Sequence, residues 1–315
     1  MKNLVGLLRN SDIMKLEMEV VFMYTAIISD QIQSDLEASF KVMKELGYKH
    51  VELHNVFGKS IEACSEDEVK EIKDLVIKYE LKVVNLASTV FFLCPLYPEY
   101  KVSLFNSEFY TIEGDIDTHL QYLENACKIA NELDCKNVRV FPFRFPDNEE
   151  IVVVGGDKDI ENISIHLSKA VKIAEEYGIT LVLENCPYSH LPKGEMTLEV
   201  IKRVNHPNLK LLWDPANSYR AEKHKVPKQY MRLDLMSEYK LIKDYIGHVH
   251  LKNYTYDSSF EKPFLHKSLL DGDIDYPKLL KEMNHQYQGC FSLEPEVNYE
   301  DTIISMKELT RITNR

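Results

Sequence analysis

Four short, largely apolar segments in the second half of the chain each run directly into an acidic or imidazole side chain. They span residues 179–183, 209–213, 246–249 and 290–293, and they are followed by Glu184, Asp214, His250 and Glu294. Apolar runs of this length predict strands that are buried on both faces, as in a parallel sheet. An ionised carboxylate is costly to bury unless a partner or a bound ion compensates its charge. We therefore predict that the four strand ends meet and that their side chains bind one divalent cation.

The whole chain alternates strands and helices, with a period of roughly 30 to 45 residues in its clearest regions. Its 315 residues suit a single (β/α)8 TIM barrel with insertions. No Pro/Gly/Ser-rich linker divides the chain, so we assign residues 1–315 to one domain in which residues 1–19 form an N-terminal extension. Active sites in this fold lie at the C-terminal ends of the strands, where all four candidate ligands are expected.

The predicted elements follow from apolar periodicity and from capping signals. Strands are expected at residues 20–24, 50–54, 81–86, 137–141, 179–184, 209–213, 246–250 and 290–294. Helices are expected at about 34–46, 65–79, 119–133, 160–177, 198–204, a segment ending near 245, 276–283 and 299–312. The sequence Ser65-Glu66-Asp67-Glu68 has the pattern of a capping box, in which the first and fourth residues close the start of a helix reciprocally.

Long segments connect several strands to the helices that follow, and we expect these loops to cover the C-terminal mouth of the barrel. They span residues 88–117, 142–157, 215–233 and 253–275. The first is rich in Phe and Tyr and contains Phe91, Phe92 and Phe105. Connections this long are usually lids or binding loops. A small hydrophobic subcore over the mouth would have the same composition, and the two interpretations are compatible.

Composition narrows the class of protein. The formal net charge is −12 and no basic run is present, which argues against a nucleic-acid partner. No apolar run is as long as a membrane span, and the N-terminal apolar run is too short for a secretory signal. The six cysteines are scattered without a Cys-x-x-Cys pair, which is typical of free thiols in a reducing cytoplasm. We expect a cytoplasmic protein whose partner is a small molecule, and a homo-oligomer remains open.

Each candidate ligand is weak evidence when it is taken alone. A strand-end Asp is often only the cap of the next helix, and Asp214 is followed directly by Pro215. A lone histidine in a strand is more often a hydrogen-bonded core residue than a ligand. Four metal-type side chains at equivalent positions of four strands are a much stronger signal. Ligation by oxygen and imidazole without cysteine favours Mn2+, Mg2+ or Co2+, and it also admits Zn2+.

At these residues the sequence resembles the xylose isomerase-like TIM barrel superfamily, which includes sugar isomerases, sugar epimerases and endonuclease IV. The matching segments are Leu183-Glu184-Asn185, Trp213-Asp214-Pro215-Ala216-Asn217, His248-Val249-His250-Leu251-Lys252-Asn253, Leu270-Asp271-Gly272-Asp273-Ile274-Asp275-Tyr276 and Ser292-Leu293-Glu294-Pro295. The resemblance spans most of the chain from about residue 20. These segments are specific for the superfamily and not for one reaction.

The resemblance to the ketose 3-epimerases implies that Glu184, Asp214, His250 and Glu294 hold one Mn2+-type ion, and that the two glutamates also move the proton. Three positions that contact substrate hydroxyls in those enzymes differ here. Asn217 stands where they have His, His190 where they have Glu, and Tyr256 where they have Arg. These differences imply a different substrate. The same Asn217 removes a zinc-binding histidine of endonuclease IV, which argues against DNA repair.

Other members of the superfamily are dehydratases that act on dehydroshikimate or on a keto-inositol. The segments 206–210 and 250–253 look similar to the former enzyme. Lys252 points to the same side of its strand as His250, which makes it either a substrate contact or the partner of a neighbouring acid. His54 lies near the mouth on the second strand and is a further candidate for substrate contact. The complete set of expected substrate-binding residues is His54, Asn185, His190, Asn217, Lys252 and Tyr256.

We interpret the chain as a metal-dependent isomerase or epimerase of a small sugar or polyhydroxy ketone, with Glu184 and Glu294 as the catalytic residues and a cation-stabilised enediolate as the intermediate. A metal-dependent dehydratase remains an alternative. A non-catalytic sugar-binding protein on the same fold is a further alternative, although it predicts a broken ligand set.

Overall fold

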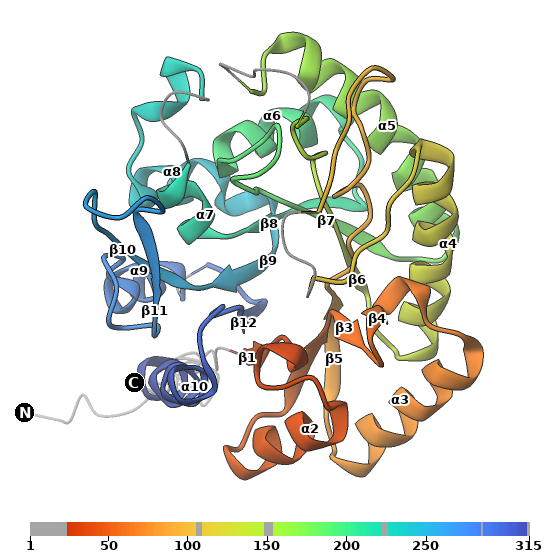
Figure 1. Ribbon diagram of the computed structural model, residues 1–315, viewed down its shortest axis with the longest axis vertical. Helices are drawn as coiled ribbons and strands as arrows, with labels where there is room; N and C mark the ends of the chain where they lie inside the picture. The colour runs from red at the N-terminus through yellow and green to blue at the C-terminus, as the bar shows by residue number, and fades with distance from the viewer. Residues whose placement is uncertain (1–23, 105–108, 148–153, 222–225, 285, 314–315) are drawn as a thin grey trace, which may run out of the picture.

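The centre of the molecule is an eight-stranded parallel sheet that curls into a barrel surrounded by helices (Figure 1). The computed structural model describes residues 24–104, 109–147, 154–221, 226–284 and 286–313. The barrel strands are β1 (Tyr24–Ile27), β2 (His50–Leu53), β5 (Lys82–Leu86), β6 (Asn137–Val140), β7 (Thr180–Glu184), β8 (Leu209–Trp213), β9 (Ile246–Leu251) and β12 (Cys290–Leu293). Their order in the sheet is β1-β12-β9-β8-β7-β6-β5-β2, and all neighbours that pair are parallel. The predicted TIM barrel is confirmed.

Helices follow the barrel strands in sequence and form the outer layer. They are α2 (Leu36–Glu45), α3 (Glu66–Lys78), α4 (Ile116–Glu132), α5 (Asp157–Glu176), α6 (Gly194–Val204), α7 (Pro215–Arg220), α8 (Leu235–Ile242), α9 (Tyr276–Met283) and α10 (Tyr299–Thr313). Short 3-10 helices occupy Ser29–Gln31, Ile61–Ala63, Lys228–Met231 and Lys243–Tyr245. The predicted strand at 20–24 and the extension 1–19 lie outside the described residues, apart from Tyr24, with which β1 opens.

Helix starts are set by side chains that satisfy free backbone N–H groups. The predicted capping box is present: the Ser65 hydroxyl accepts from the backbone of Glu68, and the Glu68 carboxylate accepts from the backbone N–H of Ser65. Helix α4 begins three residues earlier than predicted because the Asp115 carboxylate accepts from the backbone N–H of Thr118. Helix α6 begins at Gly194 rather than near Leu198, although no side chain caps it.

The barrel closes between its two outermost strands. A single parallel bridge joins Ile28, just beyond β1, to Glu52 in β2, so the sheet completes a ring. Aliphatic and aromatic side chains fill the layer between strands and helices, and they include Val51, Leu183 and Trp213, which have no exposed surface. Polar side chains, in contrast, occupy much of the barrel interior, and Glu52, Asn85, Arg139, His248 and His250 are all at most 1% exposed. Such a polar interior must be hydrogen-bonded throughout to be stable.

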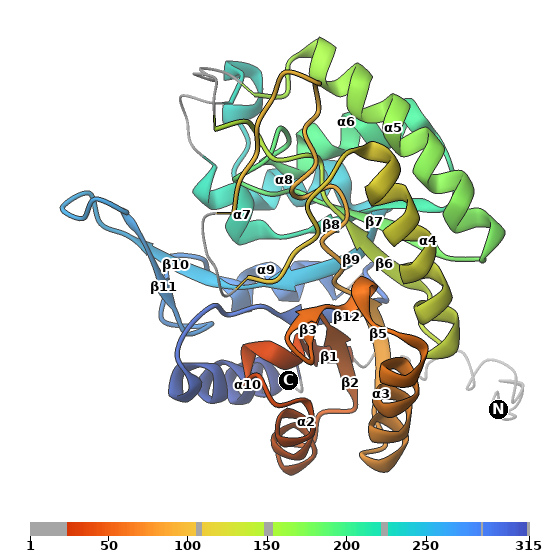
Figure 2. The ribbon, with the colours of Figure 1, turned by 45° about the vertical axis from the view of Figure 1, so that its right-hand side comes forward.

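Two of the long loops contain regular structure that the sequence did not predict. Residues 253–275, expected as a loop, form the antiparallel hairpin β10 (Asn253–Tyr256) and β11 (Phe264–Lys267), which projects well beyond the barrel wall (Figure 2). Helix α7 lies inside the segment 215–233. A second hairpin, β3 (Asn55–Val56) and β4 (Lys59–Ser60), follows β2. These elements, together with the described residues of the aromatic segment 88–117, surround the C-terminal mouth as expected.

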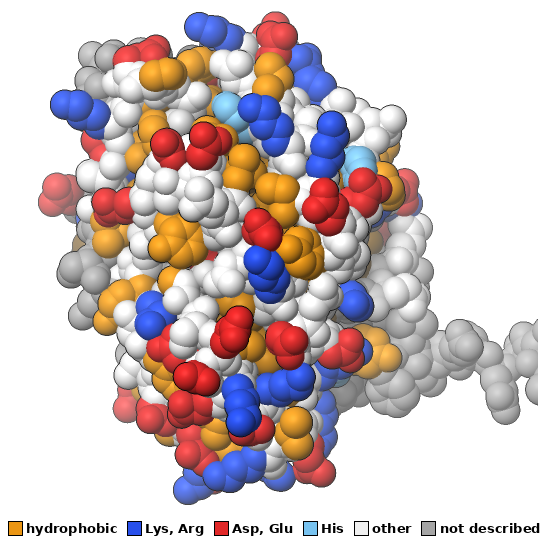
Figure 3. Space-filling model, turned by 90° about the vertical axis from the view of Figure 1, so that its right-hand side faces the viewer, with side chains coloured by type: hydrophobic (Ala, Val, Ile, Leu, Met, Phe, Trp, Pro, Cys, Tyr) orange, Lys and Arg blue, Asp and Glu red, His pale blue; other side chains and the backbone are white. Residues whose placement is uncertain are grey.

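Acidic and basic side chains intermingle on the surface that carries α4 and α5 (Figure 3). Positive charge is therefore not concentrated on the described part of this face, which agrees with the low isoelectric point of about 5.5. Within the described ranges, none of the helices is sufficiently long and apolar to cross a membrane. All six cysteines are buried as free thiols.

Candidate metal centre

The four side chains predicted to meet do lie together at the C-terminal end of the barrel. Glu184 ends β7, Asp214 follows β8, His250 lies in β9 and Glu294 follows β12. One potential donor atom from each lies within 4.8 Å of all the others. The first three side chains are at most 3% exposed, and that of Glu294 is 12% exposed. Equivalent positions on neighbouring parallel strands bring these groups to one place, as the sequence argument required.

Asp214 has one oxygen engaged and one free of hydrogen bonds. Its Oδ1 caps helix α7 by accepting from the backbone N–H groups of Ala216 at 2.8 Å and Asn217 at 3.0 Å. Its Oδ2 is buried without a hydrogen-bond partner, with Lys252 Nζ at 3.2 Å. The capping role and the proposed ligand role are therefore compatible, because they use different oxygens of the same carboxylate.

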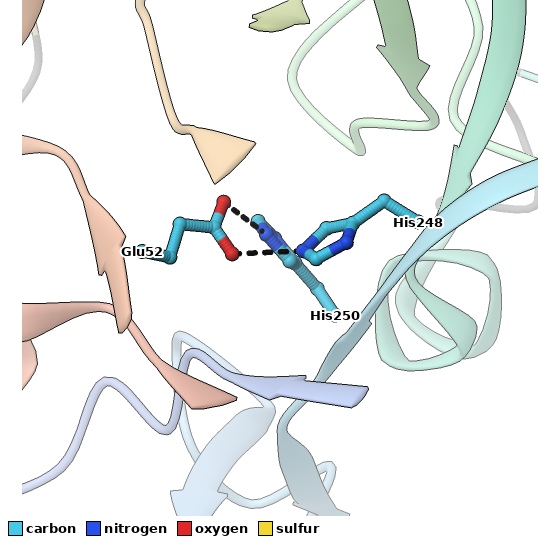
Figure 4. Close-up of side chains that lie close together, drawn as sticks. All are labelled: Glu52, His248 and His250. Atoms are coloured by element: carbon cyan, nitrogen blue, oxygen red, sulfur yellow. Dashed lines mark hydrogen bonds and ion pairs between the residues drawn. The ribbon is translucent and has the colours of Figure 1, made fainter. Parts of the chain in front are cut away.

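His250 shows the same division between its two ring nitrogens. Its Nε2 lies 2.9 Å from Oε1 of Glu52, while the other Glu52 oxygen lies 2.9 Å from Nε2 of His248 (Figure 4). Asn85 donates to the same Oε1 at 2.5 Å. Nδ1 of His250 is buried without a hydrogen-bond partner, 3.5 Å from Glu294 Oε2. Glu52 thus holds the ring so that its free nitrogen faces the carboxylates.

Glu52, His248 and His250 also form a compact group of potential ligands. Their facing atoms already hydrogen-bond one another, so this group is better explained as the support of His250 than as a second metal centre. Despite complete burial, which acts to raise it, the pKa of Glu52 lies well below its usual range because of the two histidines. The sequence analysis assigned Glu52 no role.

Arg139 in β6 is the main component of the centre that the sequence analysis missed. Its Nη1 donates to Glu184 Oε2 at 3.1 Å and to Glu294 Oε1 at 3.2 Å. Its remaining donors bond the backbone carbonyls of Ser88 and Ala87. The only sign of this role in the sequence was a charged residue between two valines of a predicted interior strand. The partners of Arg139 come from other strands that are distant in the sequence.

Lys252 is a second buried cation. Its Nζ lies 2.8 Å from Glu294 Oε2, 2.8 Å from Glu296 Oε1 and 3.2 Å from Asp214 Oδ2. Burial acts to lower the pKa of Lys252, but Asp214 and Glu294 raise it well above its usual range. Burial and Glu294 together raise the pKa of Glu184 to about 7. The pKa of Glu294 is held low, in spite of burial, by Lys252, His250 and Arg139.

The donor set fits a divalent cation. Three carboxylates, those of Glu184, Asp214 and Glu294, lie beside two buried cations, Arg139 and Lys252. Two atoms that an ion would use, Asp214 Oδ2 and His250 Nδ1, are buried without hydrogen-bond partners. Buried polar atoms are rarely left unpaired unless something else binds them. An oxygen-plus-imidazole set of this kind suits Mn2+, Mg2+, Co2+ or Zn2+.

A cavity of about 640 Å³ opens above this centre, a size that suits a small-molecule ligand. Of the residues predicted to bind substrate, His54, Asn217 and Lys252 line it. Nδ2 of Asn217 donates to Glu184 Oε1 at 3.0 Å. Nδ1 of His54 lies 3.0 Å from Asp30 Oδ2, and its Nε2 is buried without a hydrogen-bond partner.

Asn185, His190 and Tyr256, which were also predicted to bind substrate, do not line the cavity. Asn185 is fully buried, where its side chain accepts from the backbone N–H of Asp214 at 2.8 Å. His190 turns away, with Nδ1 3.2 Å from Asp159. Tyr256 is 51% exposed on β10, because the hairpin carries it outward. Of the three positions inferred by counting from the ligand motifs, His190 and Tyr256 thus lie outside the cavity lining, whereas Asn217 lies in it.

The described part of the aromatic segment divides between the two interpretations that its composition allowed. Phe92 and Phe109 line the cavity, and Phe109 packs on the His54 ring with centroids 4.9 Å apart. Phe91 instead has no exposed surface and stacks on Phe143 with centroids 5.0 Å apart. The segment is thus part cavity wall and part subcore, while Phe105 lies outside the described residues. Tyr188, Arg220 and Tyr254 also line the cavity, although they were not predicted as site residues.

Comparison with known proteins gives a consistent fold family. The model of the xylose isomerase-like TIM barrel family matches residues 40–311. An uncharacterized protein of Methanocaldococcus jannaschii is 28% identical over 205 residues, which are 62% of this chain. The matching part spans 63% of that relative.

Among solved structures, the 3-keto-D-glucoside 4-epimerase YcjR from E. coli aligns with a TM-score of 0.65 and 15% identity, covering 93% of this chain and 99% of that one. The probable 3-DHS dehydratase AsbF from Bacillus anthracis aligns with a TM-score of 0.64 and 15% identity, covering 91% and 99%. A xylose isomerase-like TIM barrel protein from Mycobacterium smegmatis, solved in complex with magnesium, aligns with a TM-score of 0.63 and 14% identity, covering 93% and 96%. At these identities the similarity establishes the fold and not the reaction.

Proposed function

Because this chain belongs to the xylose isomerase-like TIM barrel family, we propose that it is a divalent-metal-dependent enzyme that isomerises or epimerises a small sugar or polyhydroxy ketone. One observation carries the proposal: four strand-end ligands converge within 4.8 Å, and two of their inward atoms are buried without hydrogen-bond partners. A barrel that only bound sugar would have no need to keep such a set intact.

Glu184, Asp214, His250 and Glu294 would hold the ion. When bound, such an ion supplies Lewis acidity, which stabilises negative charge on an oxygen of the substrate. The surrounding residues fix the ligands beforehand: Glu52 orients His250, Asn185 orients the Asp214 backbone, and Arg139 ties the two glutamates together. Ligands held in this way lose little freedom when the ion binds.

Glu184 and Glu294 are the proposed proton carriers. They come from β7 and β12, which are separated in the sheet by β8 and β9, so the two carboxylates approach the centre from different sides. One removes a proton from the carbon next to the substrate carbonyl, and the other returns a proton to the opposite face or to the neighbouring atom. Arg139 keeps both carboxylates in place because it donates to one oxygen of each.

His54, Asn217 and Lys252 are the proposed contacts to substrate oxygens. Asp30 and Phe109 hold the ring of His54 at the cavity wall, and its Nε2 is buried without a hydrogen-bond partner. Lys252 carries a positive charge beside the carboxylates, where it would attract an electron-rich oxygen. Phe92 and Phe109 line the same space and exclude water from it.

A dehydratase acting on the same class of substrate is the second candidate function. The observation that favours it is the ammonium group of Lys252 at the cavity wall, because a fixed positive charge would stabilise a departing hydroxyl group. The two candidates share their first step, which is removal of a proton next to the carbonyl. They differ in the product, since dehydration removes one water molecule from the mass of the substrate.

Elemental analysis and isotope exchange test the proposal. Protein purified without chelator should contain about one Mn, Co, Zn or Mg per chain, and Asp214→Ala and His250→Ala should each lose it. Incubated in deuterated water with a panel of ketoses, the wild type should place deuterium on the carbon next to the carbonyl of its substrate. Loss of water from that substrate would instead identify the dehydratase.

The two glutamates are tested by a substitution that keeps shape but removes basicity. Glu184→Gln and Glu294→Gln should each still bind metal, and each should lower kcat by about 100-fold or more, the usual range for a positioned acid or base. Full activity in either variant would remove that glutamate from the mechanism. Full metal occupancy in the Asp214→Ala/His250→Ala double variant would refute the metal centre.

A further inference from the structure

The cavity is lined by a half-buried arginine, Arg220, whose partners differ from those of Arg139. Arg220, the last residue of α7, is clamped by two tyrosines: its carbon Cζ lies 4.9 Å from the ring centroid of Tyr188 and 5.3 Å from that of Tyr254. Nη1 donates to the Tyr254 hydroxyl at 3.4 Å, and Nη2 donates to the Tyr188 hydroxyl. No carboxylate among the described residues lies within 4.0 Å of this guanidinium.

That lack of an acidic partner is unusual for this cavity. Of the other cations that line it, Arg139 and Lys252 each contact two or more carboxylates. Lys262, from the turn of the β10–β11 hairpin, lines the same cavity, is exposed, and has no acidic partner in the described part of the chain. Among the described residues, Arg220 and Lys262 therefore line the cavity without an ion pair, while the carboxylate of Glu296 acts on Arg220 only from a greater distance.

The position of Arg220 relative to the candidate metal centre follows from helix geometry. Arg220 is three residues after Asn217, so the two side chains share a face of α7, about 4.5 Å apart along its axis. Asn217 contacts Glu184, one of the candidate ligands. Arg220 therefore lies roughly one helical turn along α7 from Asn217, which contacts a candidate ligand. A short carbon chain can bridge that span.

We propose that Arg220 and Lys262 form a binding subsite for an anionic group of the substrate, a phosphate ester or a carboxylate, a few carbon atoms from its carbonyl. This inference rests on the proposed function and names its substrate class. An arginine presents a planar fork of donors that matches both anions, and the two tyrosines fix that fork before binding. His266 also lines this side of the cavity, where burial lowers its pKa, so it offers a neutral ring rather than a third charge.

Three ligands that differ only at one end distinguish the possible anions. D-fructose, D-fructuronate and D-fructose 6-phosphate share a ketone at one end and carry, at the other, a neutral hydroxyl, a carboxylate and a phosphate. Their dissociation constants are measured by calorimetry on the Mn2+-loaded full-length protein. At least one anionic ligand should bind about tenfold or more tightly than D-fructose, and the one that does identifies the anion.

The variants assign that preference to the subsite. Arg220→Gln should abolish the preference for the anion, and Lys262→Gln, which breaks no described contact, should reduce it severalfold. Lys267→Gln is the matched control, because Lys267 lies on the same hairpin but outside the cavity lining, and it should leave the preference unchanged. If Arg220→Gln does not fold, Lys262→Gln and its control still test whether the anion preference depends on the subsite.

Two results would overturn the inference. One is equal affinity for all three ligands in protein that does bind Mn2+, and the other is an anion preference that survives in both subsite variants. Protein that binds no metal at all would instead refute the proposed function, so the two failures are told apart by the metal content of the sample.

Discussion

Removing the charge of Glu52 should weaken metal binding at a centre to which Glu52 contributes no ligand. An ionised carboxylate can only accept hydrogen bonds, so His248 and His250 must each donate to it through Nε2. A neutral His250 then carries its proton on Nε2 and presents the lone pair of Nδ1 to the carboxylate cluster. Glu52 therefore selects the form of His250 that can bind an ion.

The size of the effect depends on the replacement. In Glu52→Gln, the side-chain oxygen should remain at the position of Oε1, because Asn85 and His250 both donate there. The new amide nitrogen then faces His248, which must move its proton to the other nitrogen, while His250 keeps its form and loses only the neighbouring charge. Residues that support a metal ligand typically change affinity by about 10- to 100-fold. We expect about tenfold for Glu52→Gln and about 100-fold for Glu52→Ala, which correspond to about 1.4 and 2.7 kcal/mol.

The assay is calorimetric titration of Mn2+ into metal-free protein at a single pH, with a thermal melt of each variant to verify folding. Glu62→Gln is the control, because Glu62 is also fully buried and accepts three hydrogen bonds, from Ser60 and from the backbone and side chain of Thr89, away from the metal ligands. An unchanged Mn2+ affinity in folded Glu52→Ala would refute the reasoning. Equal weakening by the control would show that any buried charge has this effect.

Two further predictions concern aromatic packing and pH. Phe91→Ala should lower the free energy of unfolding by about 3 to 5 kcal/mol with little change in kinetics, because its ring is buried against Phe143. Phe92→Ala should raise KM or lower kcat, because its ring lines the cavity; steady-state kinetics and melting temperatures separate the two outcomes. Burial and Glu238 raise the pKa of Glu195 to about 7, against the opposing charge of Lys193. Relative to Glu195→Gln, the wild type should therefore lose stability, by at most about 3 kcal/mol, as the pH rises from 4.5 to 7. Below and above this window the difference in unfolding free energy between the two proteins should no longer change with pH, as measured by denaturant unfolding.

The elements that the sequence predicted well are those determined by local pattern. The apolar runs that end in Glu184 and Asp214 are strands because their length and side chains suit a buried parallel sheet. The C-terminal ends of barrel strands converge independently of the loops that follow them. The ligand cluster could therefore be predicted from the same apolar runs and the side chains that end them. The Asp115 cap is a local signal that was missed, because the apolar periodicity alone places the start of α4 too late.

The features that the sequence did not predict depend on which distant strands face one another. Arg139 in β6 contacts a carboxylate from β12 across the barrel, and Glu52 in β2 meets two histidines of β9. Those pairings require the curvature and register of the closed sheet. Counting along the chain did not reveal the place of Tyr256, because the strand ends before it and a hairpin turns it outward. Tyr254, two residues earlier on the same hairpin, lines the cavity together with Tyr188.

Each of the four candidate ligands has one atom held by an outer contact. The second atoms of Asp214 and His250 have no hydrogen-bond partner, whereas those of Glu184 and Glu294 accept from Asn217 and Lys252. Oδ1 of Asp214 caps a helix, Nε2 of His250 meets Glu52, and Arg139 takes one oxygen from each of Glu184 and Glu294. The remaining nitrogen and oxygens are the atoms that approach one another, as the 3.5 Å separation of His250 Nδ1 from Glu294 Oε2 shows. The three carboxylates cannot be held together by their own attraction, so Arg139, Lys252 and the outer contacts must oppose their repulsion. A divalent ion would relieve that repulsion directly, which is why loss of an outer contact should appear first as weaker metal binding and only later as loss of fold.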